Sequence, residues 1–297
     1  MKFSATTIVA FAGLAAAAPT KRQSGPTDAD ILNYALTLEH LEDTFYREGL
    51  ANFTQADFEA AGYDETFYGN LKRISSDEST HVSFLTGALK AAGATPVEAC
   101  QYAFGVTDVN TFLVTASVLE GVGVSAYLGA AADIMSKTYL TAAGSILTVE
   151  ARHSSYIRAS LKQTPYPQPF DTPLSINSVY TLAAQFIISC PSTNPALPVK
   201  AFPVLAASSS DMSIKKGSTV MLSTPGYMLK AENDAPVYGA FITVTGPIIV
   251  NATMVEGGYE VVVPEGVNGQ SYVVLTGCAD AVNDNTVAAG PAIVEAS

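Results

Sequence analysis

Two short stretches of this sequence place a glutamate three positions before a histidine. SSDESTH, residues 75–81, contains Glu78 and His81, and VEARH, residues 149–153, contains Glu150 and His153. The chain has 3 histidines among 297 residues, so composition alone rarely produces two such pairs. Residues three apart on a helix share a face, so each pair can direct a carboxylate and an imidazole toward one point. A single pair is more often a solvated surface contact, and the remaining helices decide between these interpretations.

Two further glutamates lie in apolar helical stretches and repeat a second spacing. Glu39 lies in YALTLEHLEDTFY and Glu120 in VTASVLEGVGVSAY, and Tyr46 and Tyr127 follow them by seven positions. Seven residues make about two helical turns, so each tyrosine returns to the face of its glutamate. A pattern of Glu-x6-Tyr and then Glu-x-x-His therefore occurs twice. This internal repeat predicts one site built by two similar helix pairs around an approximate twofold axis.

The first helix leaves alternatives for two of these roles. Glu42 lies near the same face as Glu39 and is the alternative ligand, although the Tyr46 spacing favours Glu39. His40 is interpreted as a surface or packing residue, because no Glu or His at helical spacing completes a site around it. Tyr46 and Tyr127 are interpreted equally well as core tyrosines and as groups that orient ligands or carry an electron.

The chemistry that suits these residues is binding of two metal ions. A carboxylate on an apolar helix face is costly to bury without a partner or a metal. Four carboxylates and two imidazoles give each ion one histidine, one terminal glutamate and a share of two bridging glutamates. The absence of thiolate ligands favours iron or manganese. The expected ligands are Glu39, Glu78, His81, Glu120, Glu150 and His153, and the expected cofactor is two iron or manganese ions.

Helical periodicity from Asp28 to about Ser189 supplies the elements that must position these side chains. Four long helices and a fifth helix that extends to Cys190 are expected, with a short helical turn opening at Thr54. The third helix is rich in small residues, which let helix backbones approach closely. The long helices are expected at about 28–49, 64–90, 108–133 and 139–162.

The composition changes after this helical part. PSTNPALPVKAFP is Pro-rich and is typical of a linker. Beyond it, β-branched runs such as GSTVMLS, AFITVTG, YEVVVPEG and SYVVLTG alternate with Gly, Pro and Asn, as in an antiparallel sandwich. The predicted fold class is mainly α plus a β domain: an antiparallel helical bundle at 23–190, a linker at 191–204 and a β-sandwich-like domain at 205–297.

The N-terminal residues have the pattern of a secretory signal peptide. Lys2 precedes an apolar stretch from about Ile8 to Ala15, and small residues continue to Ala18, which predicts a signal peptide at 1–18. The dibasic pair Lys21-Arg22 predicts a propeptide at 19–22. The expected location is extracellular or in the cell wall, without a membrane anchor.

Cysteines, sequons and net charge agree with secretion. We expect Cys100 to pair with Cys190, because both follow expected helix ends, which leaves Cys278 unpaired. Glycosylation is expected at the sequons of Asn52 and Asn251. The net charge of −12 disfavours nucleic acid or an anionic membrane as a partner.

The stretches LTLEHLEDTFYREGL, SSDESTH, SVLEGVGVSAYLGA and VEARHSSY make residues 28–190 resemble the ferritin-like di-metal carboxylate superfamily. Within it, the chain is similar to secreted fungal ferritin-like proteins described as stress-response proteins, whose relatives are plant desiccation-related proteins. The resemblance implies a ferritin-like four-helix bundle with the six ligands given above. It also implies that Asp77 bonds the far histidine, whereas Val149 occupies the matching place in the second copy.

Two functions are consistent with such a site. The first is a secreted di-iron or di-manganese protein that handles metal or oxidants during stress, through an oxidase or peroxide-handling activity that the sequence does not name. The alternative is a non-enzymatic cell-wall or matrix protein, in which the bundle is structural and the β domain binds a surface or a partner. A closed iron-storage shell is disfavoured by the fused β domain and the Asn52 sequon. Rubrerythrin-type peroxide reduction is disfavoured because the chain has no C-x-x-C pair.

Overall fold

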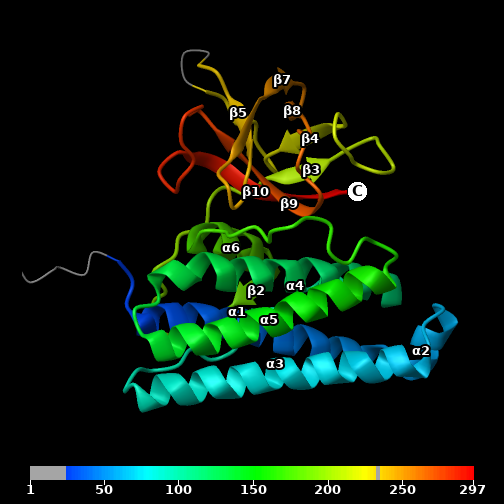
Figure 1. Cartoon of the computed structure of the whole chain (residues 1–297), viewed down its shortest axis with the longest axis vertical. Coiled ribbons are helices and arrows are strands. Elements are labelled where there is room, and N and C mark those ends of the chain that lie inside the picture. The colour runs from blue at the N-terminus through cyan, green and yellow to red at the C-terminus, as the bar shows by residue number, and fades with distance from the viewer. Residues whose placement is uncertain (1–24, 232–234) are drawn as a thin grey trace, which may run out of the picture.

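The computed structural model describes residues 25–231 and 235–297, and the architecture below refers to these residues. The expected signal peptide, the propeptide and Lys21-Arg22 lie outside them. The chain forms a helical region followed by a domain of antiparallel sheets (Figure 1). The change of composition near residue 205 therefore marks a real change of architecture.

Four long helices form most of the helical region. Each begins after a residue whose side-chain oxygen accepts a hydrogen bond from a backbone N–H of the first turn, namely Thr27, Asp64, Asp108 and Ser136. Their first and last residues lie close to the boundaries expected from periodicity. The helices are α1 Asp28–Asn52, α3 Glu65–Ala91, α4 Val109–Ala130 and α5 Lys137–Ser160, and the short α2 is Gln55–Ala60.

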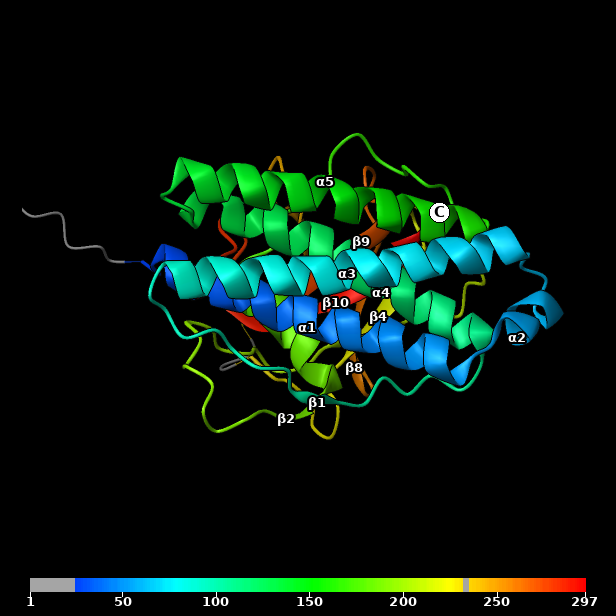
Figure 2. The ribbon, with the colours of Figure 1, turned by 90° about the horizontal axis from the view of Figure 1, so that it is seen from below.

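The long helices pack as two hairpins. α1 packs along α3 through the turn at α2, and α4 packs along α5 through the 3-10 turn η1 (Ala131–Asp133). Between the hairpins, the chain from residue 92 to residue 108 runs back along the bundle (Figure 2). α1 and α4 also contact each other, so side chains from all four helices reach a common interior.

The fifth helix is shorter than expected. α6 is Ile176–Ala183, followed by the 3-10 turn η2 (Ala184–Phe186) and the strand β2 (Ile187–Ser189). The prediction that the helix extends to Cys190 is therefore wrong. β2 pairs with β1 (Gln101–Tyr102), and this pairing, beside the disulfide, gives the β-branched Ile187 and Ile188 an extended conformation.

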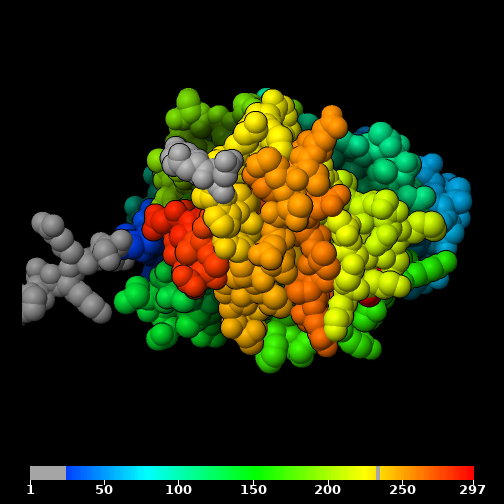
Figure 3. All heavy atoms as spheres, turned by 90° about the horizontal axis from the view of Figure 1, so that it is seen from above, coloured from blue at the N-terminus to red at the C-terminus, as the bar shows by residue number. Residues whose placement is uncertain are grey.

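The C-terminal domain contains two four-stranded antiparallel sheets that share one hydrophobic core. One sheet has the order β10-β9-β5-β6 and the other β3-β4-β8-β7. Figure 3 shows these strands covering one face of the molecule, with helical segments at its margins. The strands are β3 Ala206–Ser208, β4 Thr219–Ser223, β5 Tyr238–Phe241, β6 Ile248–Asn251, β7 Thr253–Val255, β8 Gly258–Val262, β9 Gly269–Thr276 and β10 Val287–Ala296.

The sheet domain docks on α4 through polar contacts to its backbone. Gln270 donates to the carbonyl of Val118 at 3.1 Å, and the Tyr272 hydroxyl donates to the carbonyl of Gly121 at 2.9 Å. A Cβ on Gly121 would lie 2.6 Å from the Gln270 side chain, and one on Gly129 would lie 1.8 Å from the Leu174 carbonyl oxygen. These two small residues of α4 thus admit β9 and the loop before α6, not a neighbouring long helix.

The coverage of α4 explains its composition. Among the described residues, Val109–Asp133 is the one helical stretch long and apolar enough to cross a membrane, with a mean hydropathy of 1.5. However, 67% of its most apolar window is buried inside the protein. The segment therefore has the character of a core helix, enclosed by helices on one side and by α6 and β9 on the other.

Candidate metal centre

The six candidate ligands lie in the interior of the four long helices. α1 contributes Glu39, α4 contributes Glu120, and α3 and α5 each contribute one Glu-x-x-His pair. Each of the six residues is at most 8% exposed. The interpretation of SSDESTH as a solvated surface pair is therefore excluded.

These side chains form two overlapping groups whose candidate ligand atoms lie within 4.8 Å of one another. One group contains Glu39 and His81, and the other contains Glu120 and His153. Glu78 and Glu150 belong to both groups. The arrangement matches two ions that share the two Glu-x-x-His glutamates and have one separate glutamate and one histidine each.

Both histidines direct Nδ1 at the carboxylates. His81 Nδ1 lies 3.2 Å from Glu39 and from Glu78, and 3.3 Å from Glu150. His153 Nδ1 lies 3.0 Å from Glu78 and 3.4 Å from Glu120. Because Nδ1 points inward on both rings, Nε2 is available to fix the orientation of the imidazole.

Asp77 occupies that outer position for one ring. Its carboxylate lies 3.3 Å from His153 Nε2, so α3 orients the histidine of α5. Val149, the matching residue on α5, has no polar side-chain atom with which to bond His81. The two halves of the site therefore differ in how firmly their histidines are held. Such contacts to the outer nitrogen of a histidine ligand orient the ring and tune metal binding.

The two tyrosines hold the separate glutamates crosswise. The Tyr46 hydroxyl donates to Glu120, and the Tyr127 hydroxyl donates to Glu39, so each tyrosine of one helix bonds the glutamate of the other. Both rings are buried. The sequence spacing correctly places each tyrosine at the level of the site, but the partner is not the glutamate seven residues before it.

Burial sets the protonation of the metal-free cluster. Burial raises the pKa of Glu39 to about 7, and it also raises the pKa of Glu150 and of Glu120. Burial alone lowers the pKa of His81, but the carboxylates of Glu150, Glu39 and Glu78 around its ring raise it to about 12. The same competition raises the pKa of His153 to about 11, through Glu120 and Glu78. A metal that bound to this cluster would therefore displace protons from it.

Several buried atoms of the cluster lie close to neighbouring ligand atoms but form no hydrogen bond of acceptable geometry, which tests whether a metal fits. Buried polar atoms in proteins are nearly always paired, because an unpaired one costs the desolvation energy of the group. A cation contacted by these atoms satisfies them together, and a set of carboxylate oxygens and imidazole nitrogens suits iron or manganese. The atoms are Glu78 Oε1, Glu120 Oε2, both carboxylate oxygens of Glu150, and His153 Nδ1.

The structure also separates the alternatives on α1. Glu39 belongs to a ligand group, whereas Glu42 is buried beside the cluster and belongs to neither group. Burial, followed by the charge of Glu150, raises the pKa of Glu42 well above its usual range. His40 contacts the carbonyl of Val97 at 3.1 Å and so has the packing role expected for it.

One residue beside the site was missed in the sequence. Gly123, three positions after Glu120, lies where an added Cβ would be 2.9 Å from oxygens of both Glu42 and Glu150. The signal was a glycine inside a helix, between the glutamate and the tyrosine of one repeat, which is costly unless a close approach requires it.

The remaining predicted positions lie away from the cluster. A disulfide joins Cys100 and Cys190, with Cα atoms 4.2 Å apart, and Cys278 is a free, partly exposed cysteine. Asn52 is the exposed last residue of α1, and Asn251 is the exposed last residue of β6. Both sequons are therefore accessible to a glycan.

Comparison with known proteins identifies the helical region. Residues 27–163 match the family model described as a ferritin-like domain, a range that contains all six candidate ligands. The protein is 28% identical over 187 residues to protein rds1 of Schizosaccharomyces pombe, and this match covers 63% of this chain and 46% of rds1. The match thus spans about half the length of that relative. The helical region is ferritin-like, and the protein has a fungal relative.

A solved structure with a weaker likeness is a conserved hypothetical protein, rv2844, from Mycobacterium tuberculosis. It matches with a TM-score of 0.40 and 17% identity, over 46% of this chain and 90% of that chain.

Proposed function

We propose that the helical region holds two iron or manganese ions in a carboxylate-bridged centre. Glu39 and His81 would hold one ion, Glu120 and His153 the other, and Glu78 and Glu150 would contact both. The observation that carries the proposal is the membership of Glu78 and Glu150 in both ligand groups. A solvated or purely structural charge cluster has no reason to converge on two overlapping sets of this composition.

The residues around the centre prepare it for binding. Tyr46 and Tyr127 orient the two separate carboxylates, and Asp77 orients one imidazole. The two histidines release protons on binding, and the apolar interior excludes bulk water from the carboxylates. Iron or manganese at such a site supplies one-electron redox chemistry with dioxygen or peroxide.

We further propose that the protein is secreted and handles metal or oxidants during stress. The disulfide between Cys100 and Cys190 supports an oxidising compartment, and the exposed sequon residues are compatible with it. The resemblance of the ligand stretches to secreted fungal ferritin-like proteins supports the role. In this proposal the four long helices form a four-helix bundle and the two sheets form a sandwich.

Metal stoichiometry tests the centre. The purified chain is stripped with a chelator and reloaded anaerobically with Fe(II) or Mn(II), and bound metal is counted by mass spectrometry. We expect two equivalents in the native chain and one in Glu120→Ala, because no other carboxylate takes the place of Glu120. Glu48→Ala, at an exposed glutamate of α1, is the control and keeps two.

Oxygen and peroxide electrodes then test the reaction. The metal-loaded chain is expected to consume dioxygen or hydrogen peroxide faster than the metal-free chain, and Glu120→Ala is expected to lose this difference. Two bound equivalents without any consumption would assign the metal to holding the helices together, which is the matrix-protein alternative.

A further inference from the structure

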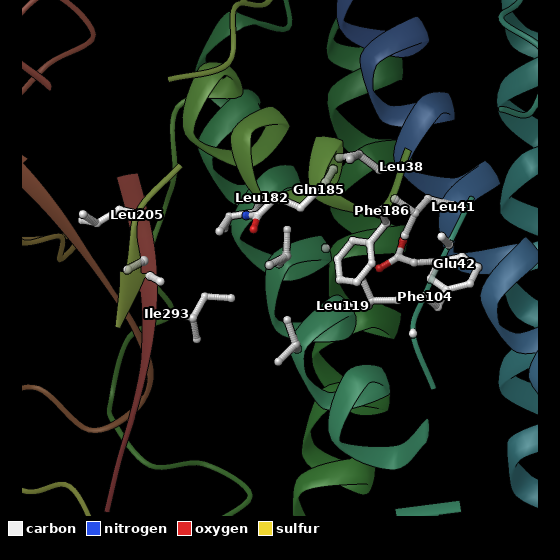
Figure 4. A pocket seen from close by; sticks show the side chains of 18 of the residues that line it. Leu38, Leu41, Glu42, Phe104, Leu119, Leu182, Gln185, Phe186, Leu205 and Ile293 are labelled. Carbon is white, nitrogen blue, oxygen red and sulfur yellow. The ribbon is translucent and has the colours of Figure 1, made fainter. Parts of the chain in front are cut away.

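A cavity of about 530 Å³ lies between the helical region and the sheet domain, beside the proposed metal centre. Its volume falls within the range of small-molecule sites, roughly 300–1,000 Å³. Its walls are mainly apolar side chains from α1, α4 and α6 on one side and from β3 and β10 on the other. Ile293 projects toward the helices across it (Figure 4).

Glu42 is the one carboxylate in the cavity lining, at the end formed by α1 and α4 (Figure 4). Glu42 is only 4% exposed. Its carboxyl group has no hydrogen-bond partner within residues 25–231 and 235–297. A carboxyl group this deeply buried has a free-energy reason to take a hydrogen-bond partner from a ligand.

Gly123 connects this end of the cavity to the metal-binding cluster. An added Cβ there would lie 2.9 Å from Glu42 Oε1 and equally close to Glu150 Oε2. Glycine thus leaves the carboxyl of Glu42 and the shared carboxylate Glu150 without a side chain between them. A molecule bound at Glu42 would therefore lie next to Glu150, one of the two glutamates that the proposed ions share.

The wall beside Glu42 is held in place by covalent and backbone contacts (Figure 4). Phe104 and Phe186 line the cavity with ring centroids 5.8 Å apart. The backbone N–H of Ala103 donates to the carbonyl of Phe186 at 2.8 Å, and the disulfide between Cys100 and Cys190 closes the same pair of segments. This wall is therefore built in advance of any ligand, as in other small-molecule sites.

We propose that this cavity binds a neutral, mainly apolar small molecule whose single hydrogen-bonding group, such as a hydroxyl, pairs with Glu42 beside the metal centre. The apolar walls disfavour hydrated inorganic ions. The unpaired Glu42 and the chain's net charge of −12 disfavour an organic anion of the same size. The volume is too small for a helix of a second chain, which leaves a small amphiphile as the occupant.

The role of this molecule as a partner of the metal centre rests on the proposed function, whereas its binding does not. Binding is therefore measured separately, on the metal-free and the metal-loaded chain. N-phenyl-1-naphthylamine, a neutral dye that fluoresces in apolar surroundings, serves as the probe. 1-Octanol and octanoate, which share a chain length and differ in charge, serve as competitors.

We expect the dye to bind both forms of the chain and 1-octanol to displace it, with octanoate at least tenfold less effective. Val118→Trp, which fills the cavity from α4, and Ile293→Trp, which fills it from β10, are each expected to reduce dye affinity at least tenfold. Val114→Trp, on the same helix but 54% exposed, is the control and keeps native affinity.

Glu42→Leu, in contrast to Glu42→Gln, tests the polar contact. Loss of one hydrogen bond is expected to reduce the affinity of the leucine variant for 1-octanol by roughly threefold to tenfold, while the glutamine variant retains most of its affinity. Native dye binding in both tryptophan variants would overturn the proposal, as would equal displacement by octanoate and 1-octanol. Failure of the chain to bind metal would instead reject the metal centre and leave these fluorescence results to decide the cavity.

Discussion

Tyr46 of α1 donates its hydrogen bond to Glu120 of α4, although Glu39 is the carboxylate on its own helix. Tyr127 of α4 returns the contact by donating to Glu39. This exchange joins the two helices directly at the level of the candidate ligands. Each ion of the proposed pair is therefore supported by a tyrosine from the opposite hairpin, which makes the two half-sites interdependent.

The crosswise contact predicts which half-site each tyrosine supports. Tyr46→Phe removes the donor to Glu120 and is expected to weaken the ion held by Glu120 and His153 by roughly 10- to 100-fold. Tyr127→Phe is expected to weaken the other ion by a similar factor. Competition titrations with a metal chelator check both variants. Equal weakening of both ions by each variant would contradict the crosswise assignment.

The shared glutamates predict a different stoichiometry from the separate ones. Glu150→Ala removes a carboxylate from both ligand groups, so we expect loss of both ions, whereas Glu39→Ala leaves one. Bound metal per chain after reloading is the measurement. The same residual stoichiometry in the two variants would show that Glu150 is not shared.

The protonation of the cluster predicts opposite pH trends for the metal-free and metal-loaded chains. The pKa of Glu39 is about 7 in the folded chain, against a reference value of 4.5, so the folded state holds an extra proton between these values. The free energy of unfolding of the metal-free chain must then fall as the pH rises through this window. The pKa of His81, about 12 against 6.5, has the same sign above pH 6.5. The lowered pKa of Glu78 acts below 4.5, outside the window.

Thermal unfolding between about pH 5 and pH 9 measures these trends. We expect the Tm of the metal-free chain to decrease with pH. The increase in Tm on adding metal should grow with pH, because ligation requires deprotonated side chains. A metal-induced increase that is largest at pH 5 would be inconsistent with the six-residue site.

The disulfide predicts that replacing a paired cysteine destabilises the protein much more than replacing the free one. Cys100 and Cys190 close a loop of sequence separation 90, so Cys100→Ser is expected to lower the free energy of unfolding by about 2–4 kcal/mol. Cys278→Ser, at the free cysteine, is the control and should change it little. Denaturant unfolding of the two variants provides the comparison.

Two helix glycines predict substitutions of opposite sign. Gly129→Ala places a Cβ 1.8 Å from the backbone oxygen of Leu174, so it must displace the loop before α6 and is expected to cost several kcal/mol, about 3 or more. Gly144→Ala on α5 meets nothing within 4 Å and should stabilise the chain by about 0.5–1 kcal/mol through helix propensity. Urea unfolding of both variants checks the pair. A neutral Gly129→Ala would mean that the loop yields easily.

The sequence by itself determined the long helices and the set of candidate ligands. Period-3.6 apolar patterns and N-cap residues are local signals, so α1, α3, α4 and α5 lie close to their expected boundaries. The two Glu-x-x-His pairs and the two lone glutamates were recognisable because a charge on an apolar helix face needs an explanation. Spacing along a helix sets the level of a side chain, which is why Tyr46 and Tyr127 were placed beside the site.

Only the tertiary structure decided which residues meet across helices. The structure places the carboxylate of Glu39, and not that of Glu42, in a ligand group, and it gives the tyrosines partners on the opposite helix. The fifth helix ended early because β2 found a partner strand 85 or more residues earlier, at β1. The β domain was expected to extend to residue 297, but the extent of β10 depends on its bulged, non-local pairing with β9, and its Gly290-Pro291 sequence is unlike a strand. The cavity at Glu42 arises between two domains, and no periodicity within either domain records a space that exists only where they pack.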